Sequence, residues 1–161
     1  MAVFTLGGRL LVASLLKSQT FFLAVGEGNP SWDTIPVEPA AADTGLVALK
    51  GFTRMREIAF VMPNEAGTIS MADGARFAVS AEPTRYLYLQ FKLDLADANG
   101  TTLRESGICH GTQLREGFPP GQMYIPEADT LAHGQMIHAD RYNSIIRDGT
   151  LEQSFSFVLT L

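Results

Sequence analysis

Residues 85–95, with the sequence RYLYLQFKLDL, alternate between two kinds of side chain at a period of two residues. One set is apolar and consists of Leu87, Leu89, Phe91, Leu93 and Leu95, and the intervening set consists of Tyr86, Tyr88, Gln90, Lys92 and Asp94. Successive side chains of a β-strand point to opposite faces, so this alternation predicts a strand with one face in a hydrophobic core. The turn-like sequence ADANG that follows predicts a hairpin with the β-like run at 101–110.

Most of the remaining chain also favours β-structure. The run TFFLAVG at 20–26 is continuously apolar, which is typical of a buried strand, and residues 52–63 are expected to form a strand that ends at Pro63. Short strands are expected after the turns at 64–68 and at Gly74, and two more at 135–142 and 150–161. Two proline-rich segments, 27–44 and 113–130, are expected to be loops, because proline donates no hydrogen bond to a sheet.

The N-terminal segment is apolar, but its pattern favours a helix that packs on the protein. Leucine and other small or apolar residues recur at helical spacing between residues 6 and 16, and they predict a short amphipathic helix over about 7–17. Arg9 and Lys17 interrupt the apolar run, which differs from the basic start of a signal peptide. The longest uncharged run, Ser18–Gly26, is far shorter than the ~20 residues of a membrane span, so no membrane partner is expected.

These elements together predict a mostly-β (α+β) fold. We expect an antiparallel β-sandwich-like domain with a short N-terminal amphipathic helix and two long proline-rich loops. The 161 residues contain no internal repeat and no low-complexity linker, so a single domain covering 1–161 is expected. Loops of such length in a compact domain usually carry function or contact a neighbour.

Charge and cysteine content narrow the function classes. The net charge of -5, without any basic run, argues against nucleic acid as a partner. A single cysteine, Cys109, excludes an intrachain disulfide and a thiolate zinc cage, and this is consistent with synthesis in a reducing cytoplasm. No cofactor motif is present: the glycine-rich VGEGNP at 25–30 lacks the phosphate-loop pattern and is followed by prolines.

Catalytic chemistry is not expected either. The three histidines are His110, His133 and His138, and the last two are five residues apart, which suits neither one helix face nor one strand face. No G-x-S-x-G motif is present to hold a nucleophilic serine, and Cys109 beside Ile108 is typical of a small buried thiol. We therefore predict no enzyme activity, no metal site and no cofactor.

An adjacent arginine and glutamate interrupt the β-like run at 101–110. Neighbours on a strand point to opposite faces, so Arg104 and Glu105 cannot pair with each other. We expect one of them to form a partly buried ion pair with Arg54, Arg56 or Glu57, and the other to reach the surface. Trp32 either pins the first loop to the core or anchors a partner. The candidate interface residues are Trp32, Ile35, Pro36, Arg104, Glu105 and Tyr124.

The order of these motifs resembles phage and prophage tail proteins, in particular the N-terminal tail-collar domain of phage tail fibres and related small baseplate proteins. The resemblance covers about residues 5–110, and its matching positions are Gly26, Gly28, Trp32, Pro36, Thr44, Leu46, Arg54, Pro63, Gly100, Leu103, Arg104, Glu105 and Gly107. It departs from the pattern at Leu103, where isoleucine is usual, and in a long spacer before Gly100. The resemblance implies a structural tail or baseplate subunit in the virion, an attachment or ring component without catalytic residues. Its partners would be other tail or baseplate subunits in a symmetric multi-copy assembly.

Two alternatives remain at this stage. The chain could be a small-ligand or carbohydrate-binding β-sandwich module in which Trp32 and Tyr124 form stacking platforms, or a hydrolase that uses His110 or His138 as a base. The structural reading predicts that the loops 27–44 and 113–130 lie against other chains and are mobile in the isolated protein. The binding-module reading predicts an exposed aromatic groove, and the hydrolase reading predicts a polar pocket around a histidine.

Overall fold

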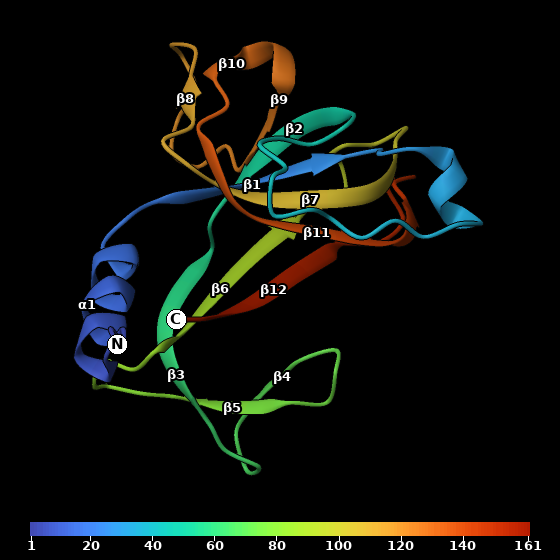
Figure 1. Cartoon of the computed structure of the whole chain (residues 1–161). Helices are drawn as coiled ribbons and strands as arrows, with labels where there is room; N and C mark the ends of the chain where they lie inside the picture. Colours follow the sequence, from blue (N-terminus) through green and yellow to red (C-terminus); the bar gives the residue numbers. More distant parts are fainter. The chain divides into compact units, whose positions relative to one another are not determined.

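The computed structural model describes residues 1–161 and contains one α-helix and antiparallel β-sheets (Figure 1). The elements are α1 (Leu6–Lys17), β1 (Phe21–Gly26), the 3-10 turn η1 (Pro30–Asp33), β2 (Leu49–Arg54), β3 (Glu57–Pro63), β4 (Ile69–Ser70), β5 (Arg76–Val79), β6 (Tyr86–Leu93), β7 (Thr102–His110), β8 (Gln113–Leu114), β9 (Tyr124–Pro126), η2 (Glu127–Asp129), β10 (Thr130–Ala132), β11 (Gln135–Ile146) and β12 (Gln153–Thr160). The predicted mostly-β class with a short N-terminal helix is confirmed.

The first five-stranded sheet has the order β11-β7-β1-β2-β9, with β1 in the middle. All residues of β1 are buried, as its continuous apolar sequence predicts. One face of β1 contributes Phe22 and Ala24 to a cluster that also contains Phe52 and Cys109. Leu46, Leu49, Leu114 and Met136 pack against this cluster. Both faces of β1 are therefore buried, which accounts for the absence of polar alternation in its sequence.

The second five-stranded sheet has the order β12-β6-β3-β5-β4. The predicted apolar face of β6 is confirmed, since Leu87, Leu89, Phe91 and Leu93 are fully buried. Leu95 lies beyond the end of the strand and is exposed. On the intervening face Tyr88 is also buried, and its hydroxyl lies 3.2 Å from the Ser156 hydroxyl.

The predicted hairpin between 85–95 and 101–110 is wrong. β6 belongs to the second sheet, whereas β7 pairs on its two edges with β1 and β11 of the first. The connection is held by Arg147, which is buried and donates hydrogen bonds to the carbonyl oxygens of Asp94 and Asp97. Alternation identifies a strand and its buried face but carries no information about which strand lies beside it.

The single strand expected over 52–63 is also wrong, because it is divided into β2 and β3 in different sheets. The break lies at Met55 and Arg56. On one side of it the amide of Arg54 donates to the carbonyl of Met123, and on the other the amide of Arg56 donates to the carbonyl of Gln90. The backbone thus changes hydrogen-bonding partner within two residues.

The second predicted loop, 113–130, contains more regular structure than expected. β8 pairs with β10 in a small two-stranded sheet, and β9 forms the edge of the first sheet beside β2. Prolines flank these pieces: Pro119 and Pro120 precede β9 and Pro126 ends it. Proline is tolerated at such edge positions, which explains why a proline-rich sequence still forms short strands.

The chain forms two compact units, one comprising residues 1–20, 55–91 and 154–161 and the other comprising 21–54 and 92–153. The single domain expected over 1–161 stays a prediction. In the first unit α1 lies beside β3, with the Lys17 ammonium 5.5 Å from the centre of the Phe60 ring (Figure 1). Thr5 caps α1 by accepting a hydrogen bond from the amide of Gly8. No helix combines the length and apolar character that crossing a bilayer requires.

Candidate interaction surfaces

Glu105 is buried in β7 with only 1% of its surface exposed, and it holds the segment 27–48 in place. Its Oε1 accepts hydrogen bonds from the amides of Gly28 and Ala48 at 3.1 and 2.8 Å, and its Oε2 accepts one from Val47 at 3.1 Å. Gly26 lies opposite in β1, where a Cβ atom would come within 2.7 Å of Oε1. Three backbone donors therefore replace the water that a buried carboxylate loses.

Arg104 holds the same segment through η1. Its Nε and Nη2 donate to the two carboxylate oxygens of Asp33, both at 2.8 Å, and its Nη1 donates to the carbonyl of Glu27 at 3.1 Å. The hydrogen bond from Arg104 lowers the pKa of Asp33 below its usual value. This two-pronged arrangement is the strong geometry for a guanidinium and a carboxylate.

The expectation for the charged pair is therefore wrong in two respects. Arg104 and Glu105 are both buried, so neither reaches the surface. Arg54, Arg56 and Glu57 are not the partners, because Arg104 pairs with Asp33 and Glu105 accepts from three backbone amides. Both charges are instead satisfied by the irregular segment that follows β1. A contact of either residue with another subunit stays a prediction.

Trp32 packs within its own chain. The Arg141 guanidinium lies 4.3 Å from the centre of the Trp32 ring, and Gly28, with φ +58°, lies so close to that ring that a Cβ would clash. Arg141 also donates to the carbonyls of Val37 and Glu38 and pairs with Asp43. These contacts favour the interpretation in which Trp32 pins the first loop, 27–44, to its own chain.

The tip of this loop remains open to solvent. Ile35 is 69% exposed, and Pro36 and Val37 are exposed beside it. A depression of about 480 Å³ lies here, lined on one side by Trp32 and Pro36 and on the other by Arg141 and neighbouring residues of β11. We call the exposed group Ile35, Pro36 and Val37 the loop tip.

Tyr124, the last candidate interface residue, is half-buried in β9 opposite Thr53. Its hydroxyl lies close to Gly51, and burial raises its pKa to about 12. One face of Trp32 is covered by Arg141, so the two aromatic rings of the carbohydrate-binding alternative both contact their own chain. Trp32 nevertheless lines the open depression beside the loop tip, so the carbohydrate-binding alternative stays a prediction.

Two of the three histidines, His110 and His138, lie in strands of the first sheet, and His133 lies between β10 and β11. His110 ends β7 and packs against Phe21, while His133 precedes β11 and lies near Glu127. His138 is within β11, and burial lowers its pKa. Cys109 is a buried free thiol whose pKa burial raises to about 11, so the predicted small buried thiol is confirmed. The absence of enzyme activity and of a metal stays a prediction.

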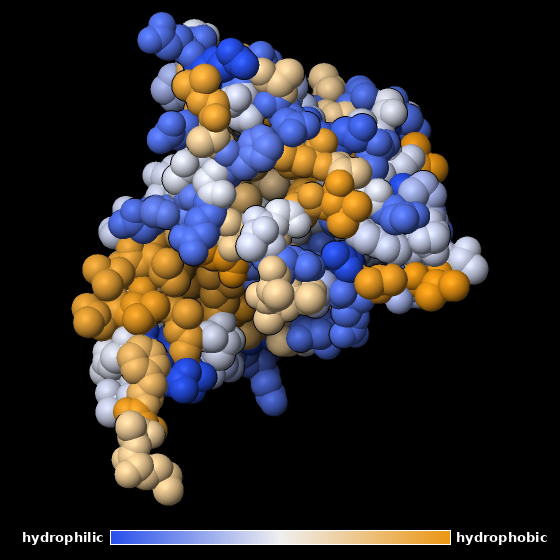
Figure 2. Space-filling model, turned by 45° about the horizontal axis from the view of Figure 1, so that its top comes forward, coloured by the Kyte–Doolittle hydropathy of each residue, from blue (hydrophilic) through white to orange (hydrophobic).

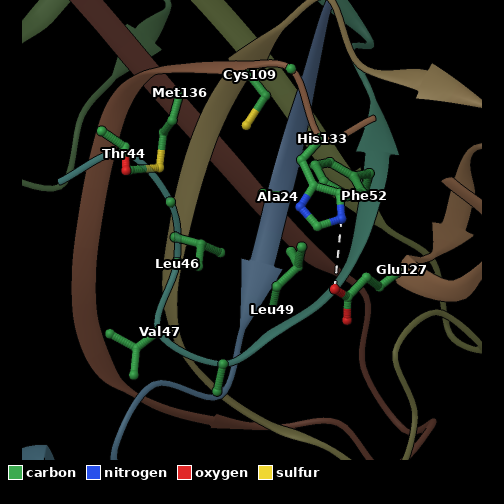
Figure 3. A pocket seen from close by; sticks show the side chains of 13 residues that line it. Ala24, Thr44, Leu46, Val47, Leu49, Phe52, Cys109, Glu127, His133 and Met136 are labelled. Carbon is green, nitrogen blue, oxygen red and sulfur yellow. Dashed lines mark ion pairs between the residues drawn. The ribbon is translucent and has the colours of Figure 1, made fainter. Parts of the chain in front are cut away.

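A pocket of about 390 Å³ opens on one face of the first sheet (Figure 3). Its lining includes Ala24, Leu46, Leu49, Phe52, Cys109 and Met136. Three polar side chains also line it, those of Thr44, Glu127 and His133. Oε1 of Glu127 lies 3.6 Å from Nε2 of His133. The histidine ring packs near Phe52, with the ring centres 5.5 Å apart. Sequence reasoning did not find this pocket, because its residues come from five separate segments.

A second exposed feature is the apolar surface of α1, which sequence reasoning also missed. Phe4, Leu6, Leu11 and Leu15 are each 57–61% exposed, and Val3 is 83% exposed. Only Ala13 of the helix is fully buried. Figure 2 shows hydrophobic side chains gathered over this helix and the residues before it. We call these five residues the α1 surface. The signal was available in the sequence, since leucines occur all round this helix.

Comparison with known protein families gives one clear result. The family model described as "Baseplate wedge 3 tail fiber network component" matches residues 1–161. No curated protein matches the sequence.

Proposed function

Because the chain belongs to the family of baseplate wedge 3 tail fibre network components, we propose that it is a non-catalytic connector that links neighbouring subunits through the α1 surface. The predicted resemblance to phage tail and baseplate proteins is confirmed. The chain is a structural baseplate subunit of the virion tail, and its partners are other baseplate or tail components. The finer role as a connector is our proposal.

The observation that carries this proposal is the exposure of the α1 surface. Large apolar side chains normally pack inside a protein, yet α1 packs on β3 with one side while its Leu6, Leu11 and Leu15 stay about 60% exposed. Phe4, just before the helix, is exposed to a similar extent. Burying each of them would contribute roughly 1–2 kcal/mol. Contiguous apolar areas on a soluble subunit mark binding surfaces.

The partner should be a hydrophobic groove on another subunit rather than the same helix of a second copy. The four side chains, each about 60% exposed, present on the order of 450 Å² per chain, so two such helices would bury at most about 900 Å², and a side-by-side pair covers only part of that area. A specific interface usually buries about 1,000 Å² or more. A groove that encloses the helix on several sides gains further area from Val3 and from the backbone at Gly7 and Gly8.

The loop tip is a second contact surface under this proposal. A subunit with two contact surfaces can join two neighbours, and repetition of such contacts generates a symmetric multi-copy ring or network. Ile35 and Pro36 among the candidate interface residues lie there. We also propose synthesis in the host cytoplasm, with which the buried free Cys109 is consistent.

The test replaces two exposed residues of the helix, Leu11→Gln with Leu15→Gln. The isolated variant should retain its free energy of unfolding within about 1 kcal/mol, because both side chains are largely exposed. Its incorporation into particles, measured by immunoblotting of purified tails or baseplates, should fall at least about tenfold.

A matched control applies the same chemistry at exposed leucines elsewhere, Leu131→Gln with Leu151→Gln, which are 63% and 73% exposed. The control should be incorporated like the unmodified chain. Normal incorporation of a folded Leu11/Leu15 variant would remove the α1 surface from the proposed function.

A further inference from the structure

We propose that the pocket over β1, β2 and β7 binds an apolar side chain that adjoins a lysine or arginine in a segment of another baseplate or tail subunit. This inference rests on the proposed function for the class of partner, but it uses a different surface. The pocket is lined wholly by residues of one compact unit. Its volume of about 390 Å³ lies in the range of specific binding pockets.

The floor of the pocket is apolar, and it is hollow because small side chains lie in the middle of the sheet. Ala24 in β1 and Cys109 in β7 lie beside Phe52 and Met136, so the surface is hollow between larger neighbours (Figure 3). Leu46 and Leu49 complete this apolar lining. A bulky aliphatic or aromatic side chain would gain free energy by replacing water on this floor.

Contacts within the chain hold the walls of the pocket in place before a ligand binds. One wall is the segment 44–49, in which the amides of Val47 and Ala48 donate to buried Glu105. The opposite wall contains Gly134, where a Cβ atom would lie 2.4 Å from the carbonyl oxygen of His110. A cavity whose walls are held by such contacts needs little rearrangement to accept a ligand, which favours binding.

The Glu127 carboxylate at the mouth of the pocket should favour a positively charged group on the ligand. Oε1 of Glu127 lies 3.6 Å from Nε2 of His133, which is longer than a hydrogen bond, and the two side chains are about half exposed. The carboxylate therefore retains capacity for a stronger donor. A lysine or arginine next to the inserted apolar side chain would supply that donor and complement the charge.

Capped dipeptides test this chemistry directly. The full-length chain, isotope-labelled, is titrated with acetyl-lysyl-phenylalanine amide and followed by NMR. We expect saturable shifts at Ala24, Phe52, Cys109 and Met136. Acetyl-glutamyl-phenylalanine amide should bind more weakly than the lysyl peptide, and acetyl-lysyl-alanine amide should produce no saturable shifts at the floor.

Two variants assign the binding to the pocket. Glu127→Gln should weaken the lysyl peptide by about threefold, whereas the exposed control Glu116→Gln should leave its affinity unchanged. Ala24→Leu, which fills the floor, should abolish the shifts. If that variant does not fold, the Glu127 variant and the peptide series still decide the matter. Equal binding of the glutamyl and lysyl peptides, or no shifts at the floor, would overturn the inference.

The outcomes separate this inference from the proposed function. Suppose that the Leu11/Leu15 variant is excluded from particles and that no peptide shifts the NMR signals of the pocket residues. The connector role would then be supported, and binding in the pocket would be rejected. If the peptides bind as expected and that variant is incorporated normally, binding in the pocket would be supported. The role of the α1 surface in assembly would be rejected.

Discussion

The segment 27–48 has almost no regular structure, and yet several of its polar groups form hydrogen bonds within the chain. By contrast, α1 is a regular, capped helix, and several of its apolar side chains are exposed to solvent. In the segment, three buried or half-buried side chains, Glu105, Arg104 and Arg141, bind backbone amides, carbonyls and carboxylates. In the helix, Leu6, Leu11 and Leu15 are each about 60% exposed. An open contact surface, more than the lack of regular structure, thus marks where a partner is needed.

This comparison changes what we expect of the first loop in the isolated protein. The loop was expected to be mobile because its prolines remove backbone donors. Several of its remaining groups nevertheless have fixed partners in the chain itself, among them the amides of Gly28, Val47 and Ala48. We now expect slow hydrogen exchange at these three amides.

The largest effect should follow from removal of the central acceptor, Glu105→Ala. Three backbone amides would lose their partner in a buried place, so the free energy of unfolding should fall by about 3 kcal/mol or more. Urea denaturation measures this change. The exposed Glu57→Ala serves as the control and should remain within about 0.5 kcal/mol.

Hydrogen exchange on the folded part of the Glu105→Ala population sharpens the result. The amides of Val47 and Ala48 should lose their protection, while that of Leu23 in the middle of β1 should keep it. A stability loss below about 1 kcal/mol would mean that water serves these amides equally well. The contrast between a self-sufficient loop and an incomplete helix would then disappear.

A smaller effect is expected from Arg141→Lys. Lysine keeps the charge but loses the flat guanidinium that lies on Trp32 and donates to two carbonyls. The free energy of unfolding should fall by about 1 kcal/mol, with faster exchange of the loop amides. The exposed Arg76→Lys in β5 is the matched control. Equal stability of the two variants would show that Trp32 does not pin the loop.

The sequence contained enough to predict most strands but not their partners. The leucines of β6 revealed its buried face because a period of two is a local signal. Nothing local indicated that β7 would lie between β1 and β11, since pairing depends on contacts far apart in the chain. Asp33 was not considered as the partner of Arg104 because it lies 71 residues away in an irregular segment.

The candidate surfaces were predicted unevenly for the same reason. Trp32 and Ile35 stood out by residue type in a proline-rich stretch, and the structure places both in that loop. The pocket escaped notice because Ala24 and Cys109 matter there by being small, which no motif records. The α1 surface escaped because the leucines were interpreted as packing on the protein, whereas Leu6, Leu11 and Leu15 are largely exposed.

The smallest effect concerns the pH dependence of the Arg104–Asp33 pair. The hydrogen bond from Arg104 lowers the pKa of Asp33 below its ordinary value of 3.8 in the folded chain. A carboxyl group with a lowered folded-state pKa contributes stability that is fully present above its unfolded pKa and is lost as the pH falls through the folded pKa. The stability difference between the unmodified chain and Asp33→Asn should therefore be constant above about pH 5 and shrink below about pH 4. The effect should be modest, since Asp33 is partly exposed and solvent screens the pair.

Urea unfolding between pH 6 and pH 2.5 measures this stability difference, with the exposed Glu65→Gln as the control. A difference that stays constant down to pH 2.5 would show that the Asp33 charge contributes nothing to anchoring the loop.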